Sequence, residues 1–183
     1  MSEFRWYKHV NKSEPITQGD FINKCPVAVP VNVFFDDPEK DKVDLVKYNV
    51  IIMSQACDLS NEKIDMVLVC PVWPLTAFGE QSDFFKSTNG KNSLRKGEVS
   101  GYHLLNVCDI AGFENEYLVV DLRNVYGVDF KFLTDFAQDQ DRLRLLPPYR
   151  EHLSQAFARF FMRVGLPLDI PKFISDKDKK KSV

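Results

Sequence analysis

Residues 50–61 read VIIMSQACDLSN, and this stretch decides the fold that we expect. Its first four residues end an apolar run, residues 48–53, which has about the length of a buried strand. A polar turn follows from Ser54. A second apolar run, MVLVCPV at residues 66–72, follows the turn. Short continuous apolar runs are typical of strands covered on both faces, so the two runs predict paired strands at the centre of a sheet.

Apolar runs bounded by turn residues recur on both sides of this central pair. β-branched and aromatic residues predict further strands at residues 18–22, 27–35, 102–107, 117–122 and 125–132. Pro30 lies within the second of these, which indicates an edge strand or a bent one. Several short strands at close spacing are typical of a small barrel, so we expect a mainly β, α+β fold.

The period of the apolar residues changes to that of a helix near the C-terminus. The positions that share one helical face are Leu153, Ala156, Phe157, Phe160, Phe161 and Val164. Pro147 and Pro148 favour a helix start before them, and Gly165 favours an end after them. The sequence therefore predicts one C-terminal helix.

Three polar segments predict irregular structure. Residues 36–44 (DDPEKDKVD) are acidic and contain a proline, as in a hairpin loop. Residues 76–100 are rich in turn residues and predict a long surface loop with one helical turn near Phe84. Residues 175–183 are too charged to pack and are expected to be a disordered tail.

Length and composition bound the class of protein. A chain of 183 residues, 44% of them apolar, can form one domain with a sizeable core, which we place at residues 1–174. The net charge of −2 gives no global positive field, so any nucleic-acid binding must be local. The N-terminus lacks the apolar core of a signal peptide, and no apolar run approaches the roughly 20 residues that cross a bilayer. A cytoplasmic protein without membrane contact is expected.

Four widely spaced cysteines include the first candidate for chemistry. Their spacing indicates neither a disulfide framework nor a zinc site, and no cofactor or metal is expected. Those assigned to the core, because they lie in or beside apolar strands, are Cys25, Cys70 and Cys108. Cys57 stands beside Asp58 after the strand, and with His103 as its base it would form a cysteine-dependent hydrolase. The competing interpretation makes Cys57 a buried structural thiol and His103 a structural residue.

Basic residues cluster twice, although the chain as a whole is slightly acidic. The members within the predicted loop are Lys86, Lys91, Arg95 and Lys96, and those late in the chain are Arg142, Arg144, Arg150, Arg159 and Arg163. Arg159 and Arg163 are four residues apart, so they are neighbours on the predicted helix and lie off its apolar stripe. We expect these two arginines and the loop cluster to contact nucleic acid. The alternative is a solvated surface whose arginines pair with nearby acidic residues, namely Asp139, Asp141 and Glu151.

The order of the elements, together with several short sequences, resembles the MazF/PemK-like toxin family. The sequences that carry the resemblance are QGDFI at residues 18–22, VIIMSQ at 50–55, VLVCPVW at 67–73, VVDLRNV at 119–125 and the helix at 153–164. The resemblance implies an SH3-like barrel closed by a C-terminal helix. It also implies an endoribonuclease activity on single-stranded RNA, a homodimer, and an antitoxin or other protein partner.

The same resemblance assigns a phosphate site. Its members in this sequence are Lys47, Ser54, Gln55 and Thr76. Lys47 stands where the family has an arginine, and a lysine supplies charge without the two-pronged fork of a guanidinium group. Val72 and Trp73 stand where the family has a serine or threonine. In the competing interpretation Ser54 and Gln55 only cap the turn by hydrogen bonds to the backbone.

Three hypotheses for function follow. The first is a nucleic-acid-related domain that resembles the family's endoribonucleases and either cleaves RNA or only binds it. The second is the cysteine-dependent hydrolase that uses Cys57 and His103. The third is a non-enzymatic module for protein interaction, which an exposed apolar patch would support.

Overall fold

The two central apolar runs form neighbouring antiparallel strands, as the sequence predicts. In the computed structural model, which describes residues 4–32, 42–108 and 115–162, β3 (Lys42–Ile52) pairs with β4 (Met66–Pro74). Their side chains alternate between two apolar clusters, because Ile51 and Cys70 lie in one cluster while Val50 and Val69 lie in the other. Both faces of the sheet are therefore covered at its centre, which is why the two runs are continuously apolar.

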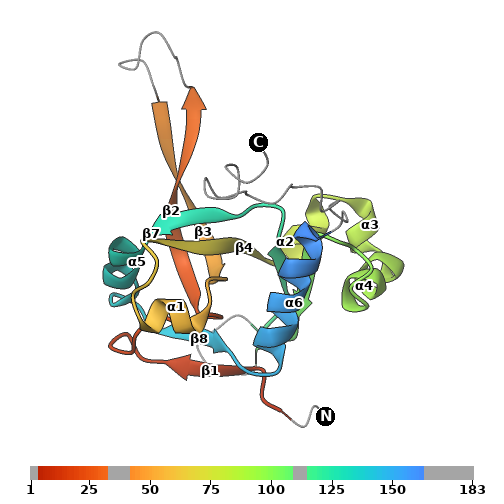
Figure 1. The fold of residues 1–183 in the computed structure, drawn as a ribbon. Helices are drawn as coiled ribbons and strands as arrows, with labels where there is room; N and C mark the ends of the chain where they lie inside the picture. The colour runs from red at the N-terminus through yellow and green to blue at the C-terminus, as the bar shows by residue number, and fades with distance from the viewer. Residues whose placement is uncertain (1–3, 33–41, 109–114, 163–183) are drawn as a thin grey trace, which may run out of the picture.

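The sheet continues on both sides of this pair (Figure 1). β2 (Phe21–Asn32) pairs with β3, while β6 (Leu118–Asp121) and then β5 (Tyr102–Leu105) follow beyond β4. β7 (Tyr126–Asp129) pairs with the first residues of β4 and β6 with the last, so these two strands form one interrupted partner of β4. All these pairings are antiparallel. The predicted α+β class is confirmed, but the sheet is open, because its end strands β2 and β5 do not pair within the described residues.

A second, two-stranded sheet lies beside the main one. β1 (Tyr7–Val10) pairs antiparallel with β8 (Arg142–Leu145), and a bridge between Asp20 and Arg144 joins this pair to the residues before β2. The sequence predicts neither strand, because four residues that alternate with charged side chains give only a weak strand signal. Their pairing depends on segments from opposite ends of the chain.

The predicted C-terminal helix is confirmed. α6 (Tyr149–Phe161) begins directly after Pro148. Leu153 is buried in the same apolar cluster as Ile51, and the half-buried residues that pack against this cluster are Ala156, Phe157 and Phe160. Phe161 is 60% exposed and does not belong to the buried face. Residues 163–183, which include the predicted helix end and the predicted tail, lie outside the described residues.

Residues 76–100 are largely helical, so the prediction of a long loop is wrong. They contain α2 (Leu75–Glu80), α3 (Asp83–Lys86) and α4 (Thr88–Arg95), which lie together on one side of the molecule (Figure 1). The serines that suggested turns begin two of these helices, since Ser82 and Ser87 each accept a hydrogen bond from a backbone N–H of the first turn.

Tertiary packing is the reason that these short helices form. Phe78 of α2 and Leu94 of α4 are almost fully buried, in an apolar cluster with Val119 of β6. Isolated helices of this length are unstable in water, so burial against the sheet stabilises them. Local sequence does not contain this contact, and the turn-like composition of the segment therefore misleads.

Other boundaries also differ from the prediction. The strand expected at residues 125–132 ends at Asp129, whose carboxylate accepts a hydrogen bond from the N–H of Phe132 (2.8 Å) and caps α5 (Phe130–Ala137). The polar turn after β3 contains α1 (Ala56–Ser60).

The predicted strands at residues 18–22 and 27–35 correspond to one long strand, β2, as far as Asn32. Residues 42–44 belong to β3 and not to a loop. Residues 33–41, where the rest of the predicted hairpin loop falls, lie outside the described residues. None of the helices within the described ranges has the length and apolar character to cross a bilayer.

Candidate functional site

A cleft of about 440 Å³ lies between the end of α4, strand β5 and helix α6. Its positive charges come from two distant parts of the chain, with Arg95 and Lys96 at the end of α4 and Arg159 on α6. His103 of β5 and His152 of α6 lie in the same lining, and none of the described residues that line this cleft is acidic. We call it the basic cleft, because its lining offers a positive field to an anion.

Helical spacing sets the contribution of α6 to the basic cleft. His152, Gln155 and Arg159 recur every three or four residues, so they lie on one face of the helix. Nη2 of Arg159 donates a hydrogen bond to Oε1 of Gln155 (3.4 Å), which directs the guanidinium group along this face. Neither Arg95 nor Arg159 pairs with a carboxylate in the part of the chain that the structure describes.

The end of α4 places the other two positive charges. Lys96 is the C-terminal cap of the helix, and Gly97 follows it with φ +69°, the left-handed conformation in which helices often end. The chain continues from there to β5, and Arg95 and Lys96 both line the basic cleft. Nζ of Lys96 lies 3.5 Å from Oε1 of Glu98, and both side chains are largely exposed, so this pair is weak.

Tyr102 lines the basic cleft and is stacked with Arg123, which lies outside the lining. Cζ of Arg123 lies 4.2 Å from the centre of the Tyr102 ring. The Asp121 carboxylate accepts hydrogen bonds from Nε (3.2 Å) and Nη2 (3.3 Å) of Arg123, which raises the pKa of that guanidinium group. Because Asp121 compensates the charge of Arg123, the field in the cleft comes from Arg95, Lys96 and Arg159.

His103 is uncharged in the basic cleft at neutral pH. Burial lowers the pKa of His103 from 6.5 to about 4, and the neighbouring His152 contributes to the lowering. A neutral imidazole donates one hydrogen bond and accepts another without adding charge. His103 can therefore bind a polar group of a ligand, while the arginines and the lysine supply the charge.

The polar turn at Ser54 lines a second cavity, of about 340 Å³, against α6. Oγ of Ser54 accepts a hydrogen bond from the N–H of Leu68 (2.9 Å) and is buried. Gln55 and Asp58 line the same cavity, and Gln55 makes no side-chain cap to α1. The turn therefore borders a concave surface. Ser54 itself has a structural role, because its hydroxyl is engaged by the backbone of β4.

Cys57 and His103 lie at different places. Cys57 is exposed on α1, which corrects the interpretation of a buried thiol, and its Sγ lies 3.7 Å from Oδ1 of Asp58. His103 lines the basic cleft, and no hydrogen bond joins it to Cys57 among the described residues. The other three cysteines are buried as expected, and burial raises the pKa of Cys25 to about 11 and that of Cys70 to about 12.

The remaining members of the phosphate site implied by the family resemblance divide between two places. Lys47 lines a third and larger cavity on β2 and β3, of about 690 Å³, whose lining also includes Pro74, two residues before Thr76. Thr76 lies at the start of α2, where its N–H (2.7 Å) and its hydroxyl (3.0 Å) both donate to the carboxylate of Glu116. Ser54 lines a different cavity from Lys47.

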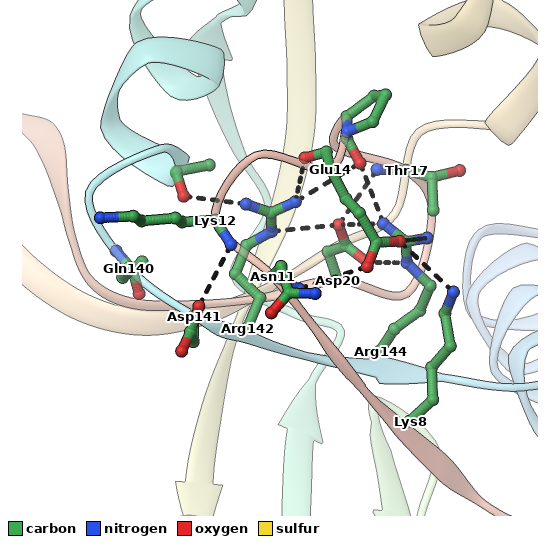
Figure 2. A network of polar contacts seen from close by, with 12 residues as sticks. Lys8, Asn11, Lys12, Glu14, Thr17, Asp20, Gln140, Asp141, Arg142 and Arg144 are labelled. Atoms are coloured by element: carbon green, nitrogen blue, oxygen red, sulfur yellow. Dashed lines mark hydrogen bonds and ion pairs between the residues drawn. The ribbon is translucent and has the colours of Figure 1, made fainter.

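The basic residues late in the chain divide into two groups with different roles. Figure 2 shows the carboxylate of Asp20 between the guanidinium groups of Arg142 and Arg144. Nε of Arg142 lies 3.3 Å and Nη2 of Arg144 2.9 Å from Oδ2 of Asp20, and Nε of Arg144 contacts Oδ1. Asp20 and Arg142 are fully buried. These two arginines are structural, and they do not join Arg159 in a surface patch.

The other predicted nucleic-acid contacts do not line the basic cleft. Lys86 and Lys91 are exposed on α3 and α4, and Lys86 pairs with Asp83 at 3.3 Å. Arg163 lies outside the described residues. Sequence reasoning missed His152 and Gln155, although their helical spacing from Arg159 was a signal for the polar face of α6.

Apolar side chains are exposed on the β2–β3 hairpin, which projects from the body of the molecule (Figure 1). Leu45 is 72% exposed, Val43 58% and Val31 51%. Such a patch is the feature that the hypothesis of a protein-interaction module requires.

Comparison with models of known protein families gives no match, and comparison with curated proteins gives none either.

Proposed function

We propose that the protein binds single-stranded RNA in the basic cleft. The observation that carries this proposal is the lining, in which Arg95, Lys96 and Arg159 supply positive charge and no described residue supplies negative charge. Phosphate contacts by lysine and arginine provide most of the affinity for nucleic acid. Three of the six side chains that the sequence assigns to nucleic-acid binding lie in this one cleft, although they come from segments far apart in the chain.

Single strands fit this cleft better than a duplex. The lining contains the aromatic residues Tyr102 and Phe160 beside the basic groups. Exposed base faces stack on aromatic side chains while the backbone phosphates meet the cations, and a duplex does not offer those faces. A volume of about 440 Å³ admits one or two nucleotides and does not admit a helix.

We also propose that the chain is related to the MazF/PemK-like toxins and that its sheet derives from an SH3-like barrel. Within this relation, we propose that the protein binds RNA without cleaving it. Lys47 and Ser54 line different cavities, which supports it, as does the engagement of the Thr76 hydroxyl by Glu116. The described residues do not support the cysteine-dependent hydrolase, because Cys57 is exposed on α1 whereas His103 lines the basic cleft.

Fluorescence anisotropy with a labelled RNA of mixed sequence, about 12 nucleotides long, tests the proposal. We expect binding whose logarithmic slope against salt is about −2, since roughly 0.7 counterions are released per phosphate contact and three cations line the cleft. The double variant Arg95→Ala, Arg159→Ala should raise Kd at least about 10-fold and reduce the salt slope.

Lys91→Ala is the matched control, because Lys91 is exposed on the same helix, α4, but lies outside the basic cleft. It should change Kd less than about twofold. Absence of RNA binding at low salt, or an equal loss in Lys91→Ala and the double variant, would refute the proposal. The RNA should remain intact, and cleavage that disappears in Lys47→Ala would instead support the endoribonuclease.

A further inference from the structure

A cavity of about 690 Å³ lies on β2 and β3 and does not share a lining residue with the basic cleft. We infer that this cavity binds an amphipathic anion, a small molecule with an aliphatic body and a carboxylate or phosphate head. The inference does not depend on RNA binding. It rests on the conformation of Lys24 and on a lining that combines positive charges with apolar residues.

The backbone at Lys24 is unusual and points to a binding role. The register between β2 and β3 shifts between Ile22 and Cys25, and Lys24 within this bulge has φ +51°. A positive φ is costly for a residue with a side chain, and bulges beside functional sites redirect side chains. The N–H of Lys24 donates to Oδ1 of Asn49 (3.0 Å), and the neighbouring N–H of Asn23 donates to Oε1 of Gln140 (2.8 Å). These bonds fix the bulge so that Lys24 lines the cavity.

The polar residues of the lining include several donors. Lys24 and Lys47 both line it and are exposed, and neither forms an ion pair within the described part of the chain. Oδ1 of Asn49 accepts the hydrogen bond from the N–H of Lys24, so the side-chain NH₂ group of Asn49 is left to donate to a ligand. No acidic residue is found in the described lining. Two ammonium groups and an amide donor match the oxygen atoms of a carboxylate or a phosphate.

The rest of the lining is mainly apolar. Its members include Pro74, Leu118 and Phe136, which are partly exposed, and Val72 and Leu143, which are buried. Small-molecule sites typically have this composition and a volume of about 300–1,000 Å³, with a few polar groups that fix the orientation of the ligand. Aliphatic residues outnumber the aromatic members Phe21 and Phe136, so an aliphatic body fits this lining.

Isothermal titration calorimetry of the full chain tests the inference with three probes of equal length: decanoate, decyl phosphate and decanol. We expect at least one of the two anions to bind with one site per chain and a Kd in the micromolar range, a typical affinity for a ligand of this size. Decanol, which has the same body without the charge, should bind at least about 10-fold more weakly. Binding of decanoate alone assigns a carboxylate head, and binding of decyl phosphate alone assigns a phosphate head.

The double variant Lys24→Gln, Lys47→Gln should weaken anion binding about 10-fold or more, and Lys12→Gln, an exposed lysine outside this cavity, is the matched control. Both variants should keep the thermal unfolding midpoint of the wild type, since the substituted side chains are exposed. Leu118→Asn should weaken the binding of all three probes.

Three outcomes would overturn the inference: no binding of either anion, equal binding of decanol, or an unchanged Kd for the anions in the double lysine variant. RNA affinity in the single variant Lys24→Gln should stay at the wild-type value, so failure of one proposal does not imply failure of the other.

Discussion

Among single residues, Asp20 is a buried charge that needs several partners. Its carboxylate is fully buried and meets two guanidinium groups, while Arg142 also donates to the carbonyl oxygen of Ala137 (2.8 Å) (Figure 2). A buried charge is costly unless it is paired and hydrogen-bonded, and here every partner is supplied. The network joins the segment before β2 to β8, so one aspartate fixes the relation of the two sheets.

Removing one member of this network should be strongly destabilising. Arg142→Met keeps much of the side-chain volume but removes one of the two cations that meet the buried Asp20, together with the guanidinium donor to the carbonyl oxygens of Ala137 and Glu14. We expect a loss of about 3–5 kcal/mol in the free energy of unfolding, measured by urea denaturation. Arg150→Met is the control, because Arg150 is only half-buried and pairs with Glu151 beside it; it should cost less than about 1 kcal/mol. A loss below about 1 kcal/mol in Arg142→Met would show that the network is not stabilising.

At the scale of elements, α3 and α4 meet through Ser87 and Gly90. Oγ of Ser87 donates to the carbonyl oxygen of Phe84 (2.6 Å) and accepts from the N–H of Gly90 (3.0 Å), so one hydroxyl group ends α3 and begins α4. Gly90 packs directly on the backbone of α3. A Cβ atom at this position would meet the carbonyl group of Phe84, with its carbon at 2.7 Å. The close approach of the two helices therefore requires a residue without a side chain.

Gly90→Ala should separate α3 from α4. Overpacking against backbone costs roughly 1–3 kcal/mol, although alanine is the better helix former. Hydrogen exchange should become faster in α3 and α4 while β3 and β4 keep their protection. Asn89→Ala, at an exposed neighbouring position, should leave the exchange unchanged. If Gly90→Ala slowed exchange in α4, helix propensity would outweigh the clash and the packing argument would be wrong. Because α4 carries Arg95, the same variant should weaken RNA binding.

For the molecule as a whole, His103 makes the free energy of unfolding depend on pH. Its pKa of about 4 in the folded state lies below the value of 6.5 for an ordinary histidine. As the pH falls below 6.5, the unfolded chain binds the proton first, so the contribution of His103 is complete above pH 6.5 and is lost toward pH 4.

The comparison of wild type with His103→Gln measures this contribution. The free energy of unfolding of the wild type should fall, relative to the variant, by up to roughly 3 kcal/mol between pH 6.5 and pH 4. His9→Gln, on β1, provides the control for loss of a histidine elsewhere. Parallel pH profiles for wild type and His103→Gln would contradict the lowered pKa of His103.

The sequence alone determined those features of the protein that depend on local hydrophobic pattern and charge. Hydrophobic pattern is local, and it was sufficient for the central pair β3 and β4, for α6 and for the burial of Cys25, Cys70 and Cys108. An apolar residue must be covered wherever it lies, so its burial follows from its own chemistry. The three cations of the basic cleft, Arg95, Lys96 and Arg159, were likewise identified by charge alone, in two separate clusters.

Only the tertiary structure decided which of these residues meet. Arg95 and Arg159 share a cleft because α4 and α6 both pack beside β5, and Lys47 lies in another cavity although its position in the sequence is close to Ser54. The helices in residues 76–100 form because Phe78 and Leu94 find Val119 on a distant strand. Contacts between distant segments depend on the positions of all the elements together, whereas a sequence pattern reports only on the neighbours of each residue along the chain.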